Sequence, residues 1–233
     1  MNNPTVEGFY DKSETYAETY ALDHLPRIQA MFDRYGLRES LKGKRLLDVG
    51  GGQGLAGTLL DPSTDYWVID GADIKPAQRL CKGTWHQVDL DYHTFGSEDG
   101  DNCLARKPQW DAAFVLEVLE HLPGIYNCVV ETKKLVKRDG DIFISVPTEE
   151  VWHNAIFPSL LWPPQNFLQW LRQMALPLVD PARDSAYIYR PTGRGWPAYQ
   201  FRCRNADWTE SEMLFKKDDP KFYGKTPQEY CNL

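Results

Sequence analysis

An aspartate followed by a run of glycines stands out at residues 46–54, which read Leu-Leu-Asp-Val-Gly-Gly-Gly-Gln-Gly. Glycines at a strand-to-helix turn let a ligand approach the backbone closely, because no Cβ intervenes and positive φ is freely available. Asp48 precedes the glycines, where a carboxylate repels phosphate and attracts a positively charged ligand. The segment therefore predicts a ligand site whose occupant is cationic rather than phosphorylated.

The same glycines permit a second interpretation. Residues 52–57, Gly-Gln-Gly-Leu-Ala-Gly, fit the Gly-x-Gly-x-x-Gly fingerprint of dinucleotide-binding units. In such a unit the first glycine directly follows the strand, whereas here two other glycines precede it. Asp48 would also repel a pyrophosphate. An NAD(P)-dependent oxidoreductase is therefore the less favoured alternative, and a purely structural glycine turn is the third.

Residues 46–54 resemble motif I of the class I S-adenosylmethionine-dependent methyltransferases, in which an acid precedes Gly-x-Gly-x-Gly. Their cofactor carries a sulfonium and an ammonium group and no phosphate. Residues 67–70 resemble the second-strand motif, whose terminal acid, here Asp70, binds both ribose hydroxyls. Asp73 is the alternative for this role. Residues 87–90 resemble the third-strand motif, whose acid accepts a hydrogen bond from the adenine amino group.

Residues 110–122 are similar to the fourth-strand block of the ubiquinone-biosynthesis-like, or type 11, branch of small-molecule methyltransferases, with the core Glu-Val-Leu-Glu-His-Leu. The resemblance covers roughly residues 9–147. It implies S-adenosyl-L-methionine as cofactor and an N-terminal helical lid. The cofactor-binding residues that it implies are Tyr16, Asp48, Gly50, Gly51, Gly52, Gly54, Asp70, Gly71, Asp89, Leu90, Leu116 and Glu117.

Glu117 and His121 are the candidates for catalysis. They lie four residues apart, so a helical turn after the fourth strand would place both on one face, near the transferred methyl group. His121 would act as a general base or bind the acceptor, and a base helps only if the nucleophile arrives protonated. The alternative is that His121 packs or caps locally.

The histidines and cysteines predict no metal site and no disulfide framework. The five cysteines are scattered, and no Cys-x-x-Cys pair or Cys/His spacing suits zinc. We therefore expect metal-independent chemistry. Because the N-terminus has no secretory leader and no apolar run approaches about 20 residues, we expect a cytoplasmic protein without a membrane span.

A doubly wound α/β sheet must position these motifs. Strands are expected at residues 44–49, 66–69, 85–90, 112–116 and 142–146, and helices at 9–35, 55–60, 76–82 and 125–137. We expect Pro26 to divide the first helix and Asp139-Gly140 to form a turn. The alternation predicts a mostly parallel sheet, and the family resemblance implies a Rossmann-like sheet of seven strands with an antiparallel edge strand.

The pattern changes after Pro147. A helix is expected at residues 165–176, and residues 186–190 and 199–204 form an antiparallel pair. We expect a single domain whose parts are a helical lid at 1–40, a cofactor-binding core at 41–147, an aromatic cap or insertion at 148–185, and edge strands with a tail at 186–233.

The acceptor site should be built from the segment that follows the fifth strand. That segment emerges above the cofactor in a parallel sheet, and its aromatic side chains suit an apolar pocket. The stripe at 167, 170, 171 and 174 is otherwise ordinary core. The candidate pocket residues are Trp152, Phe157, Trp162 and Trp170, with Arg190, Arg194, Arg202 and Arg204 for an anionic group.

Composition narrows the substrate class. The formal net charge of −7 disfavours nucleic acid as a partner. The sequence therefore predicts methyl transfer to oxygen or nitrogen of a small-molecule acceptor, which is aromatic or anionic. A non-catalytic relative that binds S-adenosylmethionine is the remaining alternative, and the oligomeric state stays open.

Overall fold

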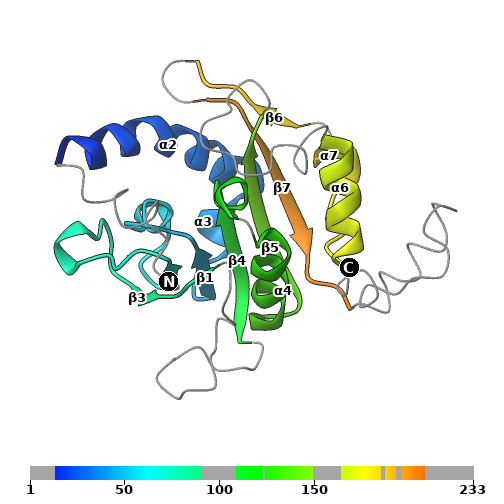
Figure 1. The fold of residues 1–233 in the computed structure, drawn as a ribbon, viewed down its shortest axis with the longest axis horizontal. Coiled ribbons are helices and arrows are strands. Elements are labelled where there is room, and N and C mark those ends of the chain that lie inside the picture. The colour runs from blue at the N-terminus through cyan, green and yellow to red at the C-terminus, as the bar shows by residue number, and fades with distance from the viewer. Residues whose placement is uncertain are drawn as a thin grey trace, which may run out of the picture.

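A computed structural model describes most of the chain (Figure 1). The described residues are 14–90, 109–122, 124–148, 164–184, 187–192 and 196–207, with side chains from residue 21 in the first helix and from residue 166 in α6. Tyr16 lies in that helix, but its side chain is outside the described part. Trp152, Phe157, Trp162 and Arg194 also lie outside the described residues.

Seven strands form one sheet in the order β3-β2-β1-β4-β5-β7-β6. The pairs among β1 to β5 are parallel, and β7 runs antiparallel to both of its neighbours. The reversed strand is therefore next to the edge strand β6. This confirms the expected doubly wound, mostly parallel sheet. The strands are β1 Arg45–Val49, β2 Asp65–Asp70, β3 Thr84–Gln87, β4 Trp110–Leu116, β5 Val136–Pro147, β6 Ile188–Tyr189 and β7 Ala198–Arg204.

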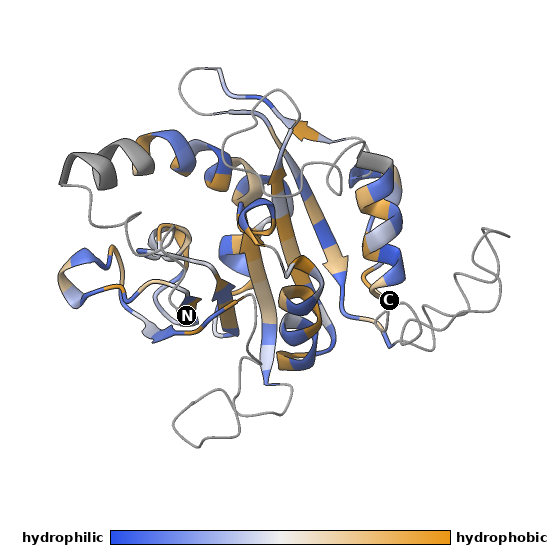
Figure 2. Ribbon diagram, in the orientation of Figure 1, coloured by the Kyte–Doolittle hydropathy of each residue, from blue (hydrophilic) through white to orange (hydrophobic). Residues whose placement is uncertain are grey.

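Helices cover both faces of the sheet, because strand residues alternate between two apolar clusters. Leu47, Val115 and Ile144 pack with the helices α4 and α6, whereas Leu46 and Phe114 pack with α2 and α3 on the other face. Figure 2 shows this as strands rich in apolar residues between helices of mixed hydropathy. The helices are α2 Glu14–Tyr35, α3 Leu37–Ser40, α4 Ile125–Leu135, α6 Pro164–Gln173 and α7 Pro181–Asp184, with the short 3-10 turns η1 Ala56–Leu59, η2 Pro76–Gln78 and η3 Leu119–His121.

The prediction that Pro26 divides the first helix is wrong, because α2 continues through it. A proline inside a helix leaves the carbonyl four residues earlier without its hydrogen bond. Leu22 is 56% exposed, so water can hydrate that carbonyl. Downstream, Met31 and Phe32 are buried against the sheet, and this packing holds the second half of the helix in line.

Three further elements differ from expectation. The segments 55–60 and 76–82 contain only the 3-10 turns η1 and η2, since glycines and prolines surround these short runs. Asp139 and Gly140 do not form a turn ahead of a strand but lie inside β5, where Asp139 has a φ of 60°. The register with β4 shifts there, so the expected turn is a bulge within one bent strand.

Candidate active site

The glycine-rich loop after β1 takes a conformation that needs glycine. Gly50, Gly52 and Gly54 have φ values of 68°, 51° and 82°. The N–H of Gly50 donates a hydrogen bond of 2.7 Å to the carbonyl of Ile69 at the end of β2. A Cβ on Gly50 would lie 2.5 Å from a methyl of Val118, which follows β4. The loop therefore lies where the carboxyl ends of three parallel strands meet.

Asp70 ends β2 directly beside this loop. Its Oδ2 accepts a hydrogen bond of 2.9 Å from the N–H of Gly52, and its Oδ1 accepts one of 2.8 Å from Ala72. A carboxylate has about four acceptor positions, so both oxygens keep one for a ligand. Burial raises the pKa of Asp70, and the two N–H donors oppose that rise. The side chain can therefore face two adjacent hydroxyls.

Asp73, the alternative to Asp70, lies in a different environment. Its side chain is 57% exposed and forms an ion pair with Lys75. No hydrogen bond connects it to the glycine loop among the contacts of the described residues. The geometry therefore favours Asp70 for the ribose.

Asp48 supports the loop from below. Its carboxylate accepts a hydrogen bond from the Tyr66 hydroxyl, and a Cβ on Gly51 would lie 2.6 Å from its carboxyl carbon. Burial raises the pKa of Asp48 to about 7, and the charge of Asp70 adds to the rise. Asp48 thus lacks a full negative charge at neutral pH. The argument that its charge attracts a cationic ligand is weakened, and its evident role is to hold the loop and Tyr66.

Two side chains that the sequence did not single out hold the loop from the β3 side. Trp85 donates a hydrogen bond of 3.0 Å from Nε1 to the carbonyl of Gly52. The Cys81 thiol contacts the carbonyl of Gly54 at 3.3 Å. These residues precede or lie in a short strand and match no motif, so only the fold shows their role.

The end of β3 lies beside Asp70. The N–H of Val88 donates to the Asp70 carbonyl at 2.8 Å, and Gln87 donates to the Gly71 carbonyl at 3.1 Å. Leu90 is buried and Asp89 is half-buried just beyond this contact. The predicted second-strand and third-strand residues are therefore neighbours in space.

Glu117, directly after β4, has a φ of 57°, which is rare for a residue with a side chain. Its N–H donates to the Ser145 carbonyl at 3.0 Å, and the following 3-10 turn begins only at Leu119. The expectation that a helical turn places Glu117 and His121 on one face is therefore wrong. Strained backbone of this kind is concentrated at functional sites.

The Glu117 carboxylate is held by side chains from three other segments. Oε1 accepts a hydrogen bond of 2.9 Å from the Ser145 hydroxyl, and Oε2 accepts one of 3.1 Å from Trp196 Nε1. Arg27 Nη1 lies 3.2 Å from Oε2. Glu117 therefore joins β4, β5, α2 and the segment before β7. Leu116 ends β4 and packs with the α2 face.

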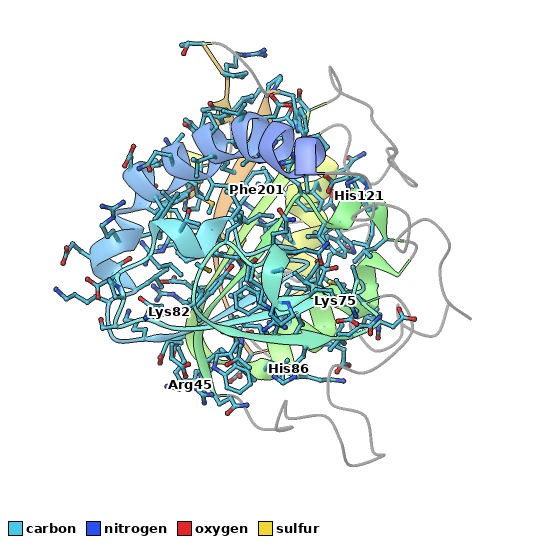
Figure 3. All side chains as sticks on the ribbon, turned by 90° about the vertical axis from the view of Figure 1, so that its left-hand side faces the viewer. Arg45, Lys75, Lys82, His86, His121 and Phe201 are labelled. Atoms are coloured by element: carbon cyan, nitrogen blue, oxygen red, sulfur yellow. The ribbon has the colours of Figure 1, made fainter. Side chains whose placement is uncertain are left out.

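His121 lies beside a second buried carboxyl group. Its Nε2 is 3.7 Å from Oε1 of Glu120, whose side chain is fully buried, whereas 34% of the His121 side chain is exposed. Burial, and then the charge of Glu117, raise the pKa of Glu120 well above its usual range. Figure 3 shows His121 far from Arg45, which begins β1. His121 is thus at the site end of the molecule.

Arg27 is the residue that sequence reasoning missed. It is 2% exposed, and it lies with His24 on the helix side that also carries Ile28 and Met31. A charged residue within an apolar stripe was the available signal, since such a residue is rarely buried without a partner. The partner, Glu117, is distant in sequence, and only the tertiary structure identifies it.

The residues predicted to bind the acceptor that the structure describes lie in different environments. Trp170 packs against the core and stacks on Phe167, which supports the ordinary core interpretation of the α6 stripe. Arg202 forms hydrogen bonds of 3.1 and 2.8 Å with the Asp141 carboxylate, so its charge is already compensated. Arg190 and Arg204 are exposed. Anion binding by Arg190, Arg194 and Arg204 therefore stays a prediction.

Two general expectations can be compared with the described residues. Among them, no group of three or more His, Cys, Asp or Glu side chains could hold a metal ion. None of the helices searched in the same part is long and apolar enough to cross a membrane. Metal-independent chemistry stays a prediction.

Residues 18–201 match a family model described as a methyltransferase domain. The chain belongs to this methyltransferase family. The match covers well over half of the chain and includes the glycine loop, Asp70, Glu117 and the strands that carry them. It confirms the predicted resemblance to the class I S-adenosylmethionine-dependent methyltransferases, together with the cofactor class that such enzymes use.

Curated relatives match a shorter part of the chain than the family model does. The chain is 29% identical over 111 residues to the ubiquinone biosynthesis O-methyltransferase of Glaesserella parasuis serovar 5 (strain SH0165), covering 45% of this chain and 46% of that protein. It is 32% identical over 114 residues to the enzyme of the same name from Pseudomonas entomophila (strain L48), covering 46% of each chain. The methyltransferase thus matches just under half the length of these relatives.

Solved structures agree on the fold. The 1,6-didemethyltoxoflavin-N1-methyltransferase of Burkholderia thailandensis, solved with its substrate and S-adenosylhomocysteine, has a TM-score of 0.54 at 17% identity, covering 85% of this chain and 84% of that one. The magnesium protoporphyrin IX methyltransferase of Synechocystis PCC 6803 with bound S-adenosylmethionine has a TM-score of 0.53 at 12% identity, covering 78% and 79%. At these identities the likeness shows the fold alone.

Two glycines with the same backbone conformation allow a matched test of the loop in this methyltransferase. Gly43 and Gly50 both have a φ of 68°, but a Cβ on Gly43 meets nothing within 4 Å. Gly43→Ala should cost about 1 kcal/mol of stability through backbone strain. Gly50→Ala should cost about 1–3 kcal/mol more, because it also overlaps Val118. Chemical denaturation of both variants measures the difference, and equal costs would contradict the packing described here.

Asp48 should make the stability of the methyltransferase depend on pH. Its pKa is raised from 3.8 to about 7 in the folded chain, so the folded state binds more protons between these values. Stability contributed by the protonated acid is present below about pH 4 and is lost as pH rises to about 7. The loss should be on the order of 3–4 kcal/mol.

The isosteric variant Asp48→Asn isolates this effect. Its amide oxygen can still accept from Tyr66 but does not titrate, so its stability should fall less between pH 4 and pH 7 than that of the wild type. Urea unfolding at several pH values provides the comparison. Parallel curves for the two proteins would show that Asp48 titrates normally.

Proposed function

We propose that the chain is an S-adenosylmethionine-dependent methyltransferase that transfers a methyl group to an oxygen or nitrogen of a small-molecule acceptor. The observation that carries this proposal is the position of Asp70, whose Oδ2 accepts a hydrogen bond from Gly52 of the positive-φ glycine loop while its Oδ1 accepts one from Ala72. The family match supports the same conclusion independently. An NAD(P)-dependent oxidoreductase is disfavoured, because two glycines precede the fingerprint at residues 52–57, whereas the first glycine of a dinucleotide-binding unit directly follows the strand.

The residues at this end of the sheet fit the parts of the cofactor. Gly50, Gly52 and Gly54 present backbone without a Cβ, Asp70 would hold the ribose hydroxyls, and Asp89 with Leu90 would meet the adenine. Tyr16, in the first helix, would cover the cofactor as part of the lid. When bound, S-adenosylmethionine supplies an electrophilic methyl group on a sulfonium.

The protein's own contribution is mainly placement. A nucleophile must approach the methyl carbon in line with the bond to sulfur, and holding both reactants in that geometry accounts for much of the acceleration. Val118 touches the glycine loop, so Glu117 and His121 are near the donor side of the site. His121, which is partly exposed, would take a proton from the acceptor or orient the acceptor. Glu117 would hold the acceptor.

The identity of the atom that receives the methyl group, oxygen or nitrogen, is the finer part of the proposal. The two curated relatives are O-methyltransferases by name, and the Burkholderia thailandensis structure is an N1-methyltransferase. Oxygen is therefore our first choice and nitrogen the second. An acidic net charge continues to disfavour nucleic acid, and the cysteine pattern favours a cytoplasmic location.

Cofactor choice tests the proposal directly. S-adenosylhomocysteine should raise the Tm, because a ligand that binds only the folded state stabilises it, by about 2.7 kcal/mol at a hundred times its Kd. NAD and NADP should not. Differential scanning fluorimetry measures the shift. Stabilisation by NAD alone would overturn the methyltransferase assignment.

Asp70→Ala and Asp73→Ala form a matched pair for the ribose contact. The first variant should lose most of the shift caused by S-adenosylhomocysteine, whereas the second should keep it, because Asp73 is exposed. The Tm of each variant without ligand separates lost folding from lost binding. The reverse result would assign the ribose to Asp73 and leave the function intact.

His121→Ala separates binding from chemistry. If His121 is the base, kcat should fall by about a hundredfold or more while the affinity for S-adenosylmethionine stays nearly unchanged. Release of S-adenosylhomocysteine, assayed with an acceptor found in a metabolite library, reports kcat. An unchanged kcat under conditions where chemistry limits the rate would return His121 to a packing role.

A further inference from the structure

A buried polar cluster lies beneath α2 and includes Glu117, which the family resemblance also assigns to the cofactor. It contains the Arg27–Glu117 ion pair, with Gln200 of β7 and Ser145 of β5 at neighbouring register positions. Gln200 donates a hydrogen bond of 2.8 Å to the carbonyl of Arg27. Arg27 and Gln200 are 2% and 1% exposed. Burying such groups is costly unless their hydrogen bonds are satisfied.

Several polar atoms of this cluster have no hydrogen-bond partner among the described residues. Arg27 Nη1 lies near the Glu117 carboxylate, but its N–H groups do not point at an acceptor. The other unpartnered atoms are both carboxyl oxygens of Glu120, Oε1 of Gln200 and Oγ1 of Thr148. The oxygens of Glu120, Gln200 and Thr148 can each accept a hydrogen bond, so the cluster can bind a molecule that brings donors.

Trp196 shows what kind of group fits beside the ion pair. Its ring lies 5.1 Å from the Arg27 guanidinium and meets the His24 ring edge-on at 4.6 Å and 86°. Its N–H donates to Glu117 Oε2 at 3.1 Å. The cluster therefore already accommodates a flat aromatic ring that carries an uncharged hydrogen-bond donor.

The charges of the cluster cancel. Arg27 is paired with Glu117, and since Arg27 donates to Nδ1 of His24 at 2.5 Å, that imidazole is neutral. Burial raises the pKa values of Glu120 and of Tyr189, which disfavours a negative charge on either side chain. An anion placed here would meet Glu117 with no unpaired positive charge to compensate it.

The geometry points to this cluster as the acceptor-recognition site of the proposed methyltransferase, for an uncharged aromatic acceptor with an O–H or N–H donor, whose place Trp196 occupies in this structure. The inference rests on the proposed function, because Val118 connects Glu117 to the glycine loop that would hold the methyl donor. Of the two expected classes, aromatic or anionic, it selects an uncharged aromatic acceptor, and it makes Arg27 and Glu117 determinants of specificity.

Indole, tryptamine and indole-3-acetate are suitable probes, since they share the ring of Trp196 and differ in charge. Trp196→Ala, saturated with S-adenosylhomocysteine, should bind indole at least tenfold more tightly than the wild type does, because the competing side chain is gone. It should bind indole-3-acetate about tenfold or more weakly than indole, because of Glu117. Isothermal titration calorimetry measures each affinity.

Glu117→Gln in the Trp196→Ala background should reverse the charge preference. It leaves Arg27 uncompensated, so indole-3-acetate should bind more tightly than indole. Glu131→Gln in the same background is the matched control, because Glu131 is also buried and paired but lies on α4. Glu131→Gln should leave the preference for indole over indole-3-acetate unchanged. A nonspecific apolar cavity would give the same preference in the Glu117→Gln and Glu131→Gln variants, so a difference between them assigns the preference to Glu117.

The outcomes separate the two proposals. Equal affinity for indole and indole-3-acetate, or no gain in indole affinity on Trp196→Ala, overturns the acceptor site while binding of S-adenosylhomocysteine leaves the methyltransferase assignment standing. Failure of the wild type to bind S-adenosylhomocysteine overturns the proposed function itself. The wild type should also bind indole more tightly than indole-3-acetate, with a lower affinity for both. Equal affinities in the wild type would overturn the acceptor site even if the variants do not fold.

Discussion

The parallel ladder of β2, β1 and β4 is the constraint on which the site depends. Parallel pairing gives these strands a common direction, so their carboxyl ends reach the same edge of the sheet. The backbone bond from Gly50 to Ile69 and the contact between Gly50 and Val118 then hold the loop against both neighbouring strands. The glycine loop, Asp70 and Glu117 lie at this edge because the ladder places them there.

The buried carboxyl groups at this edge have different hydrogen-bond partners, and these partners determine the role of each group. Asp70 accepts two backbone N–H groups and keeps acceptor positions for a ligand. Asp48 has one hydroxyl partner and its pKa rises to about 7. Glu117 has an arginine, an indole N–H and a hydroxyl, whereas Glu120 has no hydrogen-bond partner among the described residues. Similar side chains thus have different roles.

The proposed acceptor site is assembled from segments that are far apart in the chain. Arg27 comes from the N-terminal helix, Glu117 from the end of β4, and Trp196 from the segment before β7. Because β7 inserts between β5 and the edge strand β6, it brings Gln200 next to Ser145. In the proposed acceptor site, recognition would therefore depend on the reversed strand as well as on the strands that carry the proposed cofactor site.

The sequence by itself determined the methyltransferase family, the sheet and the positions of Asp70 and Glu117, because glycine spacing and alternating strand patterns are local signals. It could not determine that α2 passes through Pro26 or that Asp139 lies in a bulge, since packing outweighs local preference there. It also could not show that Arg27 pairs with Glu117. That contact joins residues ninety positions apart, and only the tertiary structure brings a buried charge to its partner.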